Sequence, residues 1–245
     1  MNSKMISSNN DPKLTLTTHL MELRKRLIIS LAALFFGVVV CFFWGQELLF
    51  ALLMAPLQRL NQELVLLAVT EGFYLQIKIA FLGGLFLALP VIMWQSIAFI
   101  LPALYANERK VFWTFFITTV VLFGVGVVFA YTVVLDLALK ILLLEFNAGF
   151  NTMLSATRYL SFIVAFLLPF GAIFEIPVLV LLLTKMKLIT PARLRKKRRY
   201  VILAIFILAA ILTPPDVISQ VLLALPMLIL YEISILVSYL VSRDK

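Results

Sequence analysis

The chain has 245 residues, of which 63% are hydrophobic and only 13% are charged. Soluble domains carry about 25% charged residues, so the composition and the long uncharged runs exclude an ordinary soluble domain and predict one membrane domain over residues 1–245. The net charge of +9 would suggest nucleic acid in a soluble protein. In a membrane protein these cations are topology anchors, and we expect no nucleic-acid partner. The single cysteine, Cys41, excludes an intrachain disulfide.

The N-terminal part combines a polar tail with a basic helix. Residues 1–18 are polar, and we expect a flexible cytoplasmic tail there. Residues 19–27, H-L-M-E-L-R-K-R-L, place leucines at helical spacing between charges, which predicts an interfacial helix leading into a first span at about 27–44. A signal peptide also begins in this way. Because G-Q-E at 45–47 offers no small-residue cleavage pattern, we expect a retained transmembrane helix.

The apolar runs that follow predict five further spans, at about 73–100, 111–135, 159–184, 200–212 and 217–240. Two stretches, 46–72 and 136–158, are expected to be loops on the opposite side from the N-terminus. The short apolar pieces within 46–72 should lie along the membrane surface or cap the bundle. The fifth segment would be only about 20 Å long as a helix, so we also predict a local thinning of the bilayer there.

Proline and glycine positions add local detail to these spans. Pro90 removes a helix donor inside the second span and leaves the carbonyl of Phe86 unpaired, which predicts a kink. Gly124 and Gly126 thin one side of the third span, which predicts a close contact with another helix.

Lysine and arginine positions orient the predicted helices. With six spans both termini lie on one side, and that side carries seventeen of the 21 basic residues, against three in the opposite loops and one, Lys78, near the end of a span. The positive-inside rule places the basic side in the cytoplasm. The predicted fold is therefore an all-α integral membrane protein with six transmembrane helices, both termini cytoplasmic, and short fifth and sixth spans.

Two acids, Glu22 and Glu108, stand near span ends on this basic face. They could simply pair with the neighbouring Arg26 and Arg109, and surface pairs of that kind contribute about 0–1 kcal/mol and carry no function. Alternatively, two fixed carboxylates could receive the guanidinium groups of an incoming basic peptide, with Phe99 as an apolar contact beside them.

Glu175 is an acid about 14 Å inside the fourth span. A central ionisable residue costs on the order of 2.5–3.5 kcal/mol on insertion scales and usually faces a cavity or a partner, so we predict a functional role. The alternative is a protonated side chain that bonds a carbonyl freed by Pro177, such as that of Ile173.

The outer end of the last hairpin carries Thr213 and Gln220, which could hold that turn together or receive a polar group from another protein's helix. Glu232 lies nearer the cytoplasmic end of its span. The sequence contains no P-loop, no metal-ligand pattern and no nucleophile motif. We therefore expect neither an enzyme nor a cofactor nor a metal site.

Five segments, taken in order, resemble the TatC family, the multispanning receptor subunit of the twin-arginine protein translocase. The resemblance extends over nearly the whole chain, from about His19 to Tyr239. The segments are H-L-M-E-L-R-K-R-L (19–27), P-V-I-M-W-Q-S-I-A-F-I-L-P-A-L-Y-A-N-E-R (90–109), F-E-I-P (174–177), L-R-K-K-R-x-Y (194–200) and T-P-P-D-V-I-S-Q (213–220).

The resemblance implies a receptor for the twin-arginine signal peptides of folded precursors. It implies TatA-like and TatB-like single-span partners, self-association, transport driven by the proton-motive force, and a place in the cell inner membrane among its lipids. By motif, Glu22 and Glu108 would receive the twin arginines, with Arg24, Gln95 and Phe99 at the same peptide site. Pro56 and Pro90 would shape the helices, and Glu175 would face the concave side of a cupped bundle. Thr213 and Gln220 would contribute to a partner-helix site.

Two other functions are compatible with parts of the pattern. A proton-coupled transporter of small molecules could use Glu175 as its carrier, but such folds usually contain internal repeats and none is evident between the two halves. A scaffold for single-span proteins would need no peptide recognition, and charge reversal at Glu108 would leave it intact.

Overall fold

The computed structural model describes residues 12–100, 109–145, 153–186, 188–212 and 217–243, and these are mostly helical. By length and composition, five stretches could cross a membrane: Thr17–Gln58, Glu71–Phe99, Phe112–Leu143, Ala156–Lys185 and Leu223–Val241. The protein is thus a mostly helical, multi-pass membrane protein. Helix α9 (Arg198–Leu212) has 15 residues, in line with the short fifth segment expected from the sequence. The helix of the sixth segment, Val217–Arg243, has 27 residues and is not short. Six spans and cytoplasmic termini stay predictions, and the 1–18 tail lies mainly outside the described residues.

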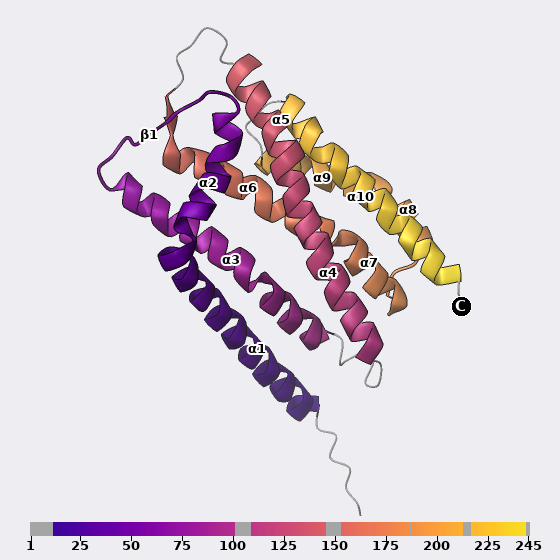
Figure 1. Ribbon diagram of the computed structural model, residues 1–245. Coiled ribbons are helices and arrows are strands. Elements are labelled where there is room, and N and C mark those ends of the chain that lie inside the picture. Colours follow the sequence, from indigo (N-terminus) through magenta and orange to yellow (C-terminus); the bar gives the residue numbers. More distant parts are fainter. Residues whose placement is uncertain (1–11, 101–108, 146–152, 187, 213–216, 244–245) are drawn as a thin grey trace, which may run out of the picture.

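The first helix continues much further than the sequence suggested. Helix α1 (Pro12–Val40) passes through a wide π turn, η1 (Cys41–Gly45), directly into α2 (Gln46–Gln58), which runs in a new direction (Figure 1). The prediction of a loop beginning at Gln46 was therefore wrong. Gln46, Glu47 and Pro56 indicate a loop locally, but Pro56 stands near the end of α2, where a hydroxyl from another helix bonds the carbonyl that it leaves free.

Pro56 creates a carbonyl without a helical partner, and the fold supplies one from another helix. Because proline has no N–H, the carbonyl of Leu52 lacks its usual donor. The hydroxyl of Tyr131 donates to that carbonyl at 2.5 Å, and the hydroxyl of Tyr159 donates to the next one, of Leu53, at 2.9 Å. The carbonyl that Pro56 leaves free thus joins α2 to a residue far along the chain.

Helix α3 (Glu71–Ile100) packs along α1 through glycines (Figure 1). A Cβ added at Gly84 would lie 2.4 Å from the backbone nitrogen of Val38, and one added at Gly37 would lie 2.6 Å from the carbonyl oxygen of Gly84. A Cβ at either position would clash with the other helix, so the backbones of α1 and α3 lie in direct contact there. Small residues are the usual means of packing helices in lipid, where burial of apolar surface gives little driving force.

Helix α4 (Arg109–Phe129) continues through η3 (Ala130–Val134), α5 (Leu135–Lys140) and η4 (Ile141–Glu145). The loop predicted to begin at residue 136 is therefore helical in its first part. Gly126 makes the expected close contact, because an added Cβ would lie 2.8 Å from the ring of Phe174. The same expectation was wrong for Gly124, where an added Cβ would have no neighbour within 4 Å.

Helix α6 (Ala156–Phe174) forms the centre of the bundle. Its inward side chains recur at helical spacing and are all at most 4% exposed: Leu160, Ile163, Phe166, Leu167 and Phe170. At Glu175 the helix breaks, and α7 (Ile176–Lys185) starts with Pro177 in its first turn, where a missing N–H costs nothing. The predicted fourth segment is therefore two helices rather than one.

A small cap joins the beginnings of α3 and α6. Strands β1 (Leu64–Val65) and β2 (Leu154–Ser155) pair in parallel. The buried carboxylate of Glu71 accepts hydrogen bonds from the Ser155 hydroxyl at 2.7 Å, from the Thr157 N–H at 3.2 Å and from the Leu67 N–H. This three-donor contact fixes the cap.

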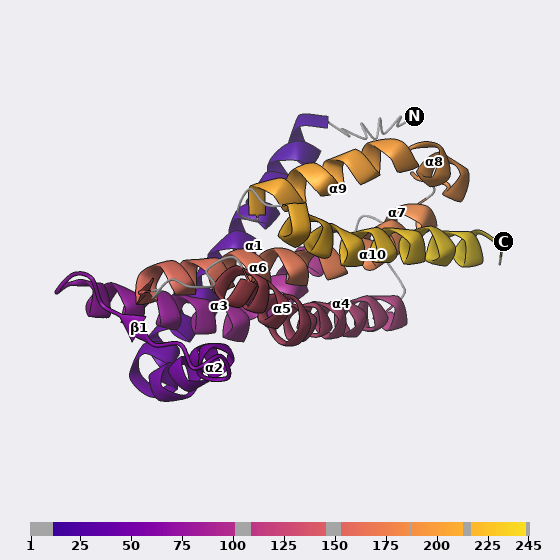
Figure 2. The ribbon, with the colours of Figure 1, turned by 90° about the horizontal axis from the view of Figure 1, so that it is seen from above.

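The C-terminal helices α8 (Pro191–Lys196), α9 and α10 (Val217–Arg243) gather at the edge of the molecule opposite α2 (Figure 2). Helix α10 packs on α7, where the hydroxyls of Thr184 and Ser238 lie 2.7 Å apart. Arg198 of α9 pairs with Glu232 of α10.

Candidate functional site

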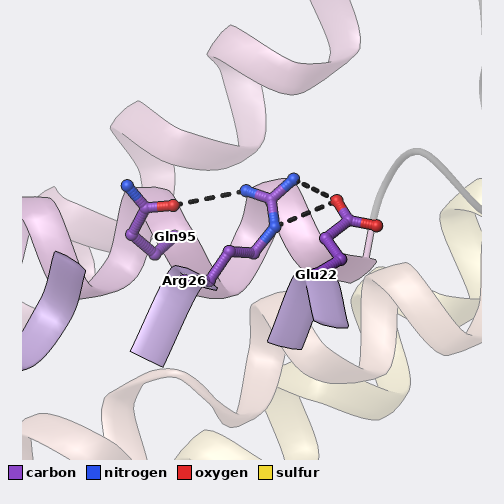
Figure 3. Close-up of polar contacts among 3 residues, drawn as sticks. All are labelled: Glu22, Arg26 and Gln95. Atoms are coloured by element: carbon purple, nitrogen blue, oxygen red, sulfur yellow. Dashed lines mark hydrogen bonds and ion pairs between the residues drawn. The ribbon is translucent and has the colours of Figure 1, made fainter. Parts of the chain in front are cut away.

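Three polar side chains from α1 and α3 form a connected cluster (Figure 3). The Arg26 guanidinium donates to Oε1 of Glu22 from Nη2 at 2.6 Å and from Nε at 3.1 Å, and it donates from Nη1 to Oε1 of Gln95 at 3.3 Å. The i, i+4 spacing puts Glu22 and Arg26 on one face of α1, and the packing of α1 on α3 brings Gln95 to that face.

The Glu22 carboxylate can accept a further hydrogen bond. The Glu22 side chain is 43% exposed, whereas that of Arg26 is 20% exposed. Both hydrogen bonds from Arg26 end on Oε1, and Oε2 accepts none from the described residues (Figure 3). Arg26 therefore holds the carboxylate in place and leaves one oxygen open to an incoming donor.

An aromatic stack continues the cluster at the same end of α1 and α3. The rings of His19 and Phe99 lie nearly parallel, with centroids 4.4 Å apart. His19 begins the segment predicted as an interfacial helix, and its contact with the predicted site residue Phe99 is a finding of the structure.

Two predicted members of the site remain apart from the cluster. Arg24 is exposed, and it does not share a helix face with Glu22, because the two positions are two residues apart. Glu108 lies in 101–108, outside the described residues. The structure thus brings together Glu22, Gln95 and Phe99 and leaves the second acid of the prediction untested.

Glu175 stands at the junction of α6 and α7 and lines an apolar cavity of about 230 Å³ between α3, α4 and α7. Ser96 and Thr119 supply the other hydroxyls of its lining. The Thr119 hydroxyl and the Phe123 backbone approach the carboxyl group, but Oε1 is buried and has no hydrogen-bond partner among the described residues. The alternative bond to the Ile173 carbonyl does not form.

Of the two polar residues predicted at the last hairpin, only Gln220 is described. Its Nε2 donates to the carbonyl of Phe206 in α9 at 3.0 Å, so this side chain joins the two helices of the hairpin. Thr213 lies outside the described residues. Pro90 lies within α3, and the kink and shaping role predicted for it stay predictions.

Sequence reasoning missed the Glu71 contact described above and a second one nearby. Lys78 of α3 donates to the Ser161 hydroxyl of α6 at 3.1 Å. The available signal was charge: Glu71 is an acid in the first turn of a helix, where negative charge is favoured, and Lys78 is the one cation that topology left inside a span.

Comparison with known proteins places these features in a family. The family model described as Sec-independent protein translocase protein (TatC) matches residues 18–226. The TatC protein of Carboxydothermus hydrogenoformans is 41% identical over 236 residues, covering 96% of this chain and 97% of the relative. That of Escherichia coli K12 is 40% identical over 226 residues, covering 91% and 87%.

A solved structure agrees with the sequence comparison. The crystal structure of a twin-arginine translocase receptor TatC superposes with a TM-score of 0.80 at 41% identity, covering 91% of this chain and 99% of the other. The family-model match over residues 18–226 includes the residues of the Glu22 cluster and those that line the Glu175 cavity. This chain therefore belongs to the TatC family of Sec-independent protein translocase proteins, which are transport proteins and not enzymes.

Proposed function

We propose that this chain is the receptor subunit of a twin-arginine translocase and that it binds twin-arginine signal peptides at the cytoplasmic face of the inner membrane. One observation carries the proposal: Glu22 is half-exposed, is held by Arg26, and has an oxygen to which no described residue donates. A peptide guanidinium can donate to that oxygen without displacing Arg26. Hydrogen bonds to charged groups contribute about 1.5–3 kcal/mol, enough for at least tenfold in affinity.

The neighbouring groups fit the rest of such a peptide. The amide of Gln95 lies on the far side of Arg26, and the Phe99 ring, stacked on His19, offers an apolar surface next to the charged cluster. In this proposal Glu108 supplies the second carboxylate and Arg24 lies at the margin of the site. Both termini are cytoplasmic, TatA-like and TatB-like single-span proteins are the partners, the chain self-associates, and the proton-motive force drives transport.

The test is photocrosslinking to a twin-arginine precursor from a probe at Met21, an exposed position next to Glu22. Glu22→Gln should reduce the crosslink at least tenfold. Glu63→Gln, which removes an exposed acid far along the chain, is the matched control and should leave the crosslink unchanged. Crosslinks of equal strength with a twin-lysine precursor, or after Glu22→Gln, would refute guanidinium recognition at this site.

Glu175 has a separate role in the proposal, after peptide binding. Its unpartnered carboxyl oxygen in an apolar cavity is the kind of intramembrane group that usually faces a partner or carries charge. Glu175→Gln keeps the shape and removes ionisation, so we expect the Met21 crosslink to persist while transport falls. Unchanged transport would rule out a required charge at Glu175. Loss of both readouts would argue for a structural role.

A further inference from the structure

The connection between α7 and α9 carries the densest charge of the chain. Six of the seven positions from 193 to 199 are basic, and all six side chains are exposed. We call residues 190–200 the basic elbow. To orient the protein in the membrane, these charges need only lie on one side of it.

The basic elbow is also held in a fixed position, which topology does not require. The Thr190 side chain caps α8 by accepting from the Arg193 N–H at 3.4 Å. The Tyr231 hydroxyl of α10 donates to the carbonyl of Leu194 at 2.8 Å. Arg198 forms an ion pair with Glu232 of α10. Two contacts thus join the basic elbow to α10, and the Thr190 cap fixes the start of its short helix.

Most of the positive charge of the elbow stays uncompensated. The Arg199 guanidinium lies over the ring of Tyr200, 4.8 Å from its centroid, and Arg198 is neutralised by Glu232. The other four cations form no ion pair with any residue that the structure describes: Arg193, Arg195, Lys196 and Lys197.

An apolar face begins directly below these cations. Tyr200, Leu203 and Ile207 of α9 recur at helical spacing and are 58%, 59% and 52% exposed. In a membrane protein such a face meets lipid chains, and an exposed tyrosine at its end is typical of the headgroup level. The elbow therefore holds four free cations at the height of lipid headgroups.

We propose that the basic elbow is a binding site for anionic phospholipid headgroups of the phosphatidylglycerol type. The Arg and Lys side chains pair with the lipid phosphate, and the acyl chains lie along Tyr200, Leu203 and Ile207. Clusters of four to eight cations next to a membrane helix bind acidic lipid in general, and here the cluster is also preorganised. The site is independent of signal-peptide recognition at Glu22.

The experiment measures binding of fluorescent phosphatidylglycerol and phosphatidylcholine to the purified full chain in a non-ionic detergent, by anisotropy. Each cation near an anionic surface contributes about fivefold, so Lys196→Gln/Lys197→Gln should weaken phosphatidylglycerol binding about 30-fold. Lys78→Gln/Arg158→Gln removes the same charge from exposed side chains outside the elbow and is the control. It should change binding less than twofold.

A second measurement needs no variant and so does not depend on variant folding. Raising salt from 0.1 M to 1 M shortens the screening length from about 10 Å to about 3 Å, and wild-type binding of phosphatidylglycerol should weaken accordingly. Equal binding of the two lipids, or equal losses in both double variants, would overturn the proposal. Preferential binding of polyglutamate over phosphatidylglycerol would overturn it too, and would assign the elbow to an acidic protein partner.

Discussion

Replacing Tyr131 by Phe removes one hydroxyl, and the structure indicates what that loss should cost. The hydroxyl donates to the Leu52 carbonyl at 2.5 Å, and Pro56 denies that carbonyl its helical donor. In soluble proteins an unpaired polar group costs about 1–3 kcal/mol, while hydrogen bonds between membrane helices average about 0.6 kcal/mol. Because the contact is on an exposed edge of the bundle, we expect Tyr131→Phe to destabilise the protein by about 1 kcal/mol.

A double-mutant cycle isolates the cause of that loss. Pro56→Ala restores the missing N–H, so Tyr131→Phe should cost much less in that background, giving a coupling energy of about 0.5–1 kcal/mol. Tyr159→Phe is the control, because its acceptor, the Leu53 carbonyl, faces the N–H of Leu57 in either background. The assay is unfolding in mixed micelles followed by circular dichroism. An identical cost of Tyr131→Phe with and without Pro56 would refute the reasoning.

Two further predictions concern the packing of the helices and the cap, both measured by the same unfolding assay. Gly84→Ala should destabilise the protein by about 1–3 kcal/mol, because the new Cβ would lie 2.4 Å from a backbone nitrogen of α1. Gly124→Ala is the control and should be close to neutral, because the space around Gly124 is open. Equal effects of the two substitutions would contradict the close crossing of α1 and α3. Glu71→Gln should lower the unfolding midpoint more than Glu63→Gln, because of the two side chains only Glu71 accepts hydrogen bonds from three donors. Equal midpoints for the two variants would show that this contact does not stabilise the cap.

The apolar helices could be predicted from the sequence because their signal is local. Long uncharged runs need no knowledge of the rest of the fold, and they indicate helices in lipid since every backbone group must be paired there. The short α9 was also readable, because the cations at 193–199 and the prolines at 214 and 215 bound it in the sequence itself.

The helical course of residues 46–58 could not be predicted in this way. The polar Gln46 and Glu47 and the later Pro56 indicate a loop when they are read locally. What makes a proline acceptable near the end of α2 is a hydroxyl donor at Tyr131, 75 residues away in the sequence. A tertiary contact of this kind has no signature in the local pattern.

The candidate site was predictable in part, for the same reason. The i+4 spacing of Glu22 and Arg26 predicts their pair from the sequence alone, and the pair forms. The arrival of Gln95 depends on how α1 lies along α3, and that packing is set by Gly37 and Gly84. The residues of the site were therefore identifiable by resemblance, while their mutual contacts follow from a glycine crossing elsewhere on the same two helices.

The buried polar groups of the described residues differ in whether they have a hydrogen-bond partner. Pro56 is compensated by Tyr131, and the Glu71 carboxylate is fully engaged in the cap. In the described part of the chain only two buried side-chain polar atoms lack a partner, Thr157 Oγ1 and Glu175 Oε1. The first lies beside the Glu71 carboxylate, so its surroundings are already polar. Among the described residues, Glu175 alone combines an unpartnered buried oxygen with an apolar cavity, and this is the observation behind the intramembrane role proposed for it.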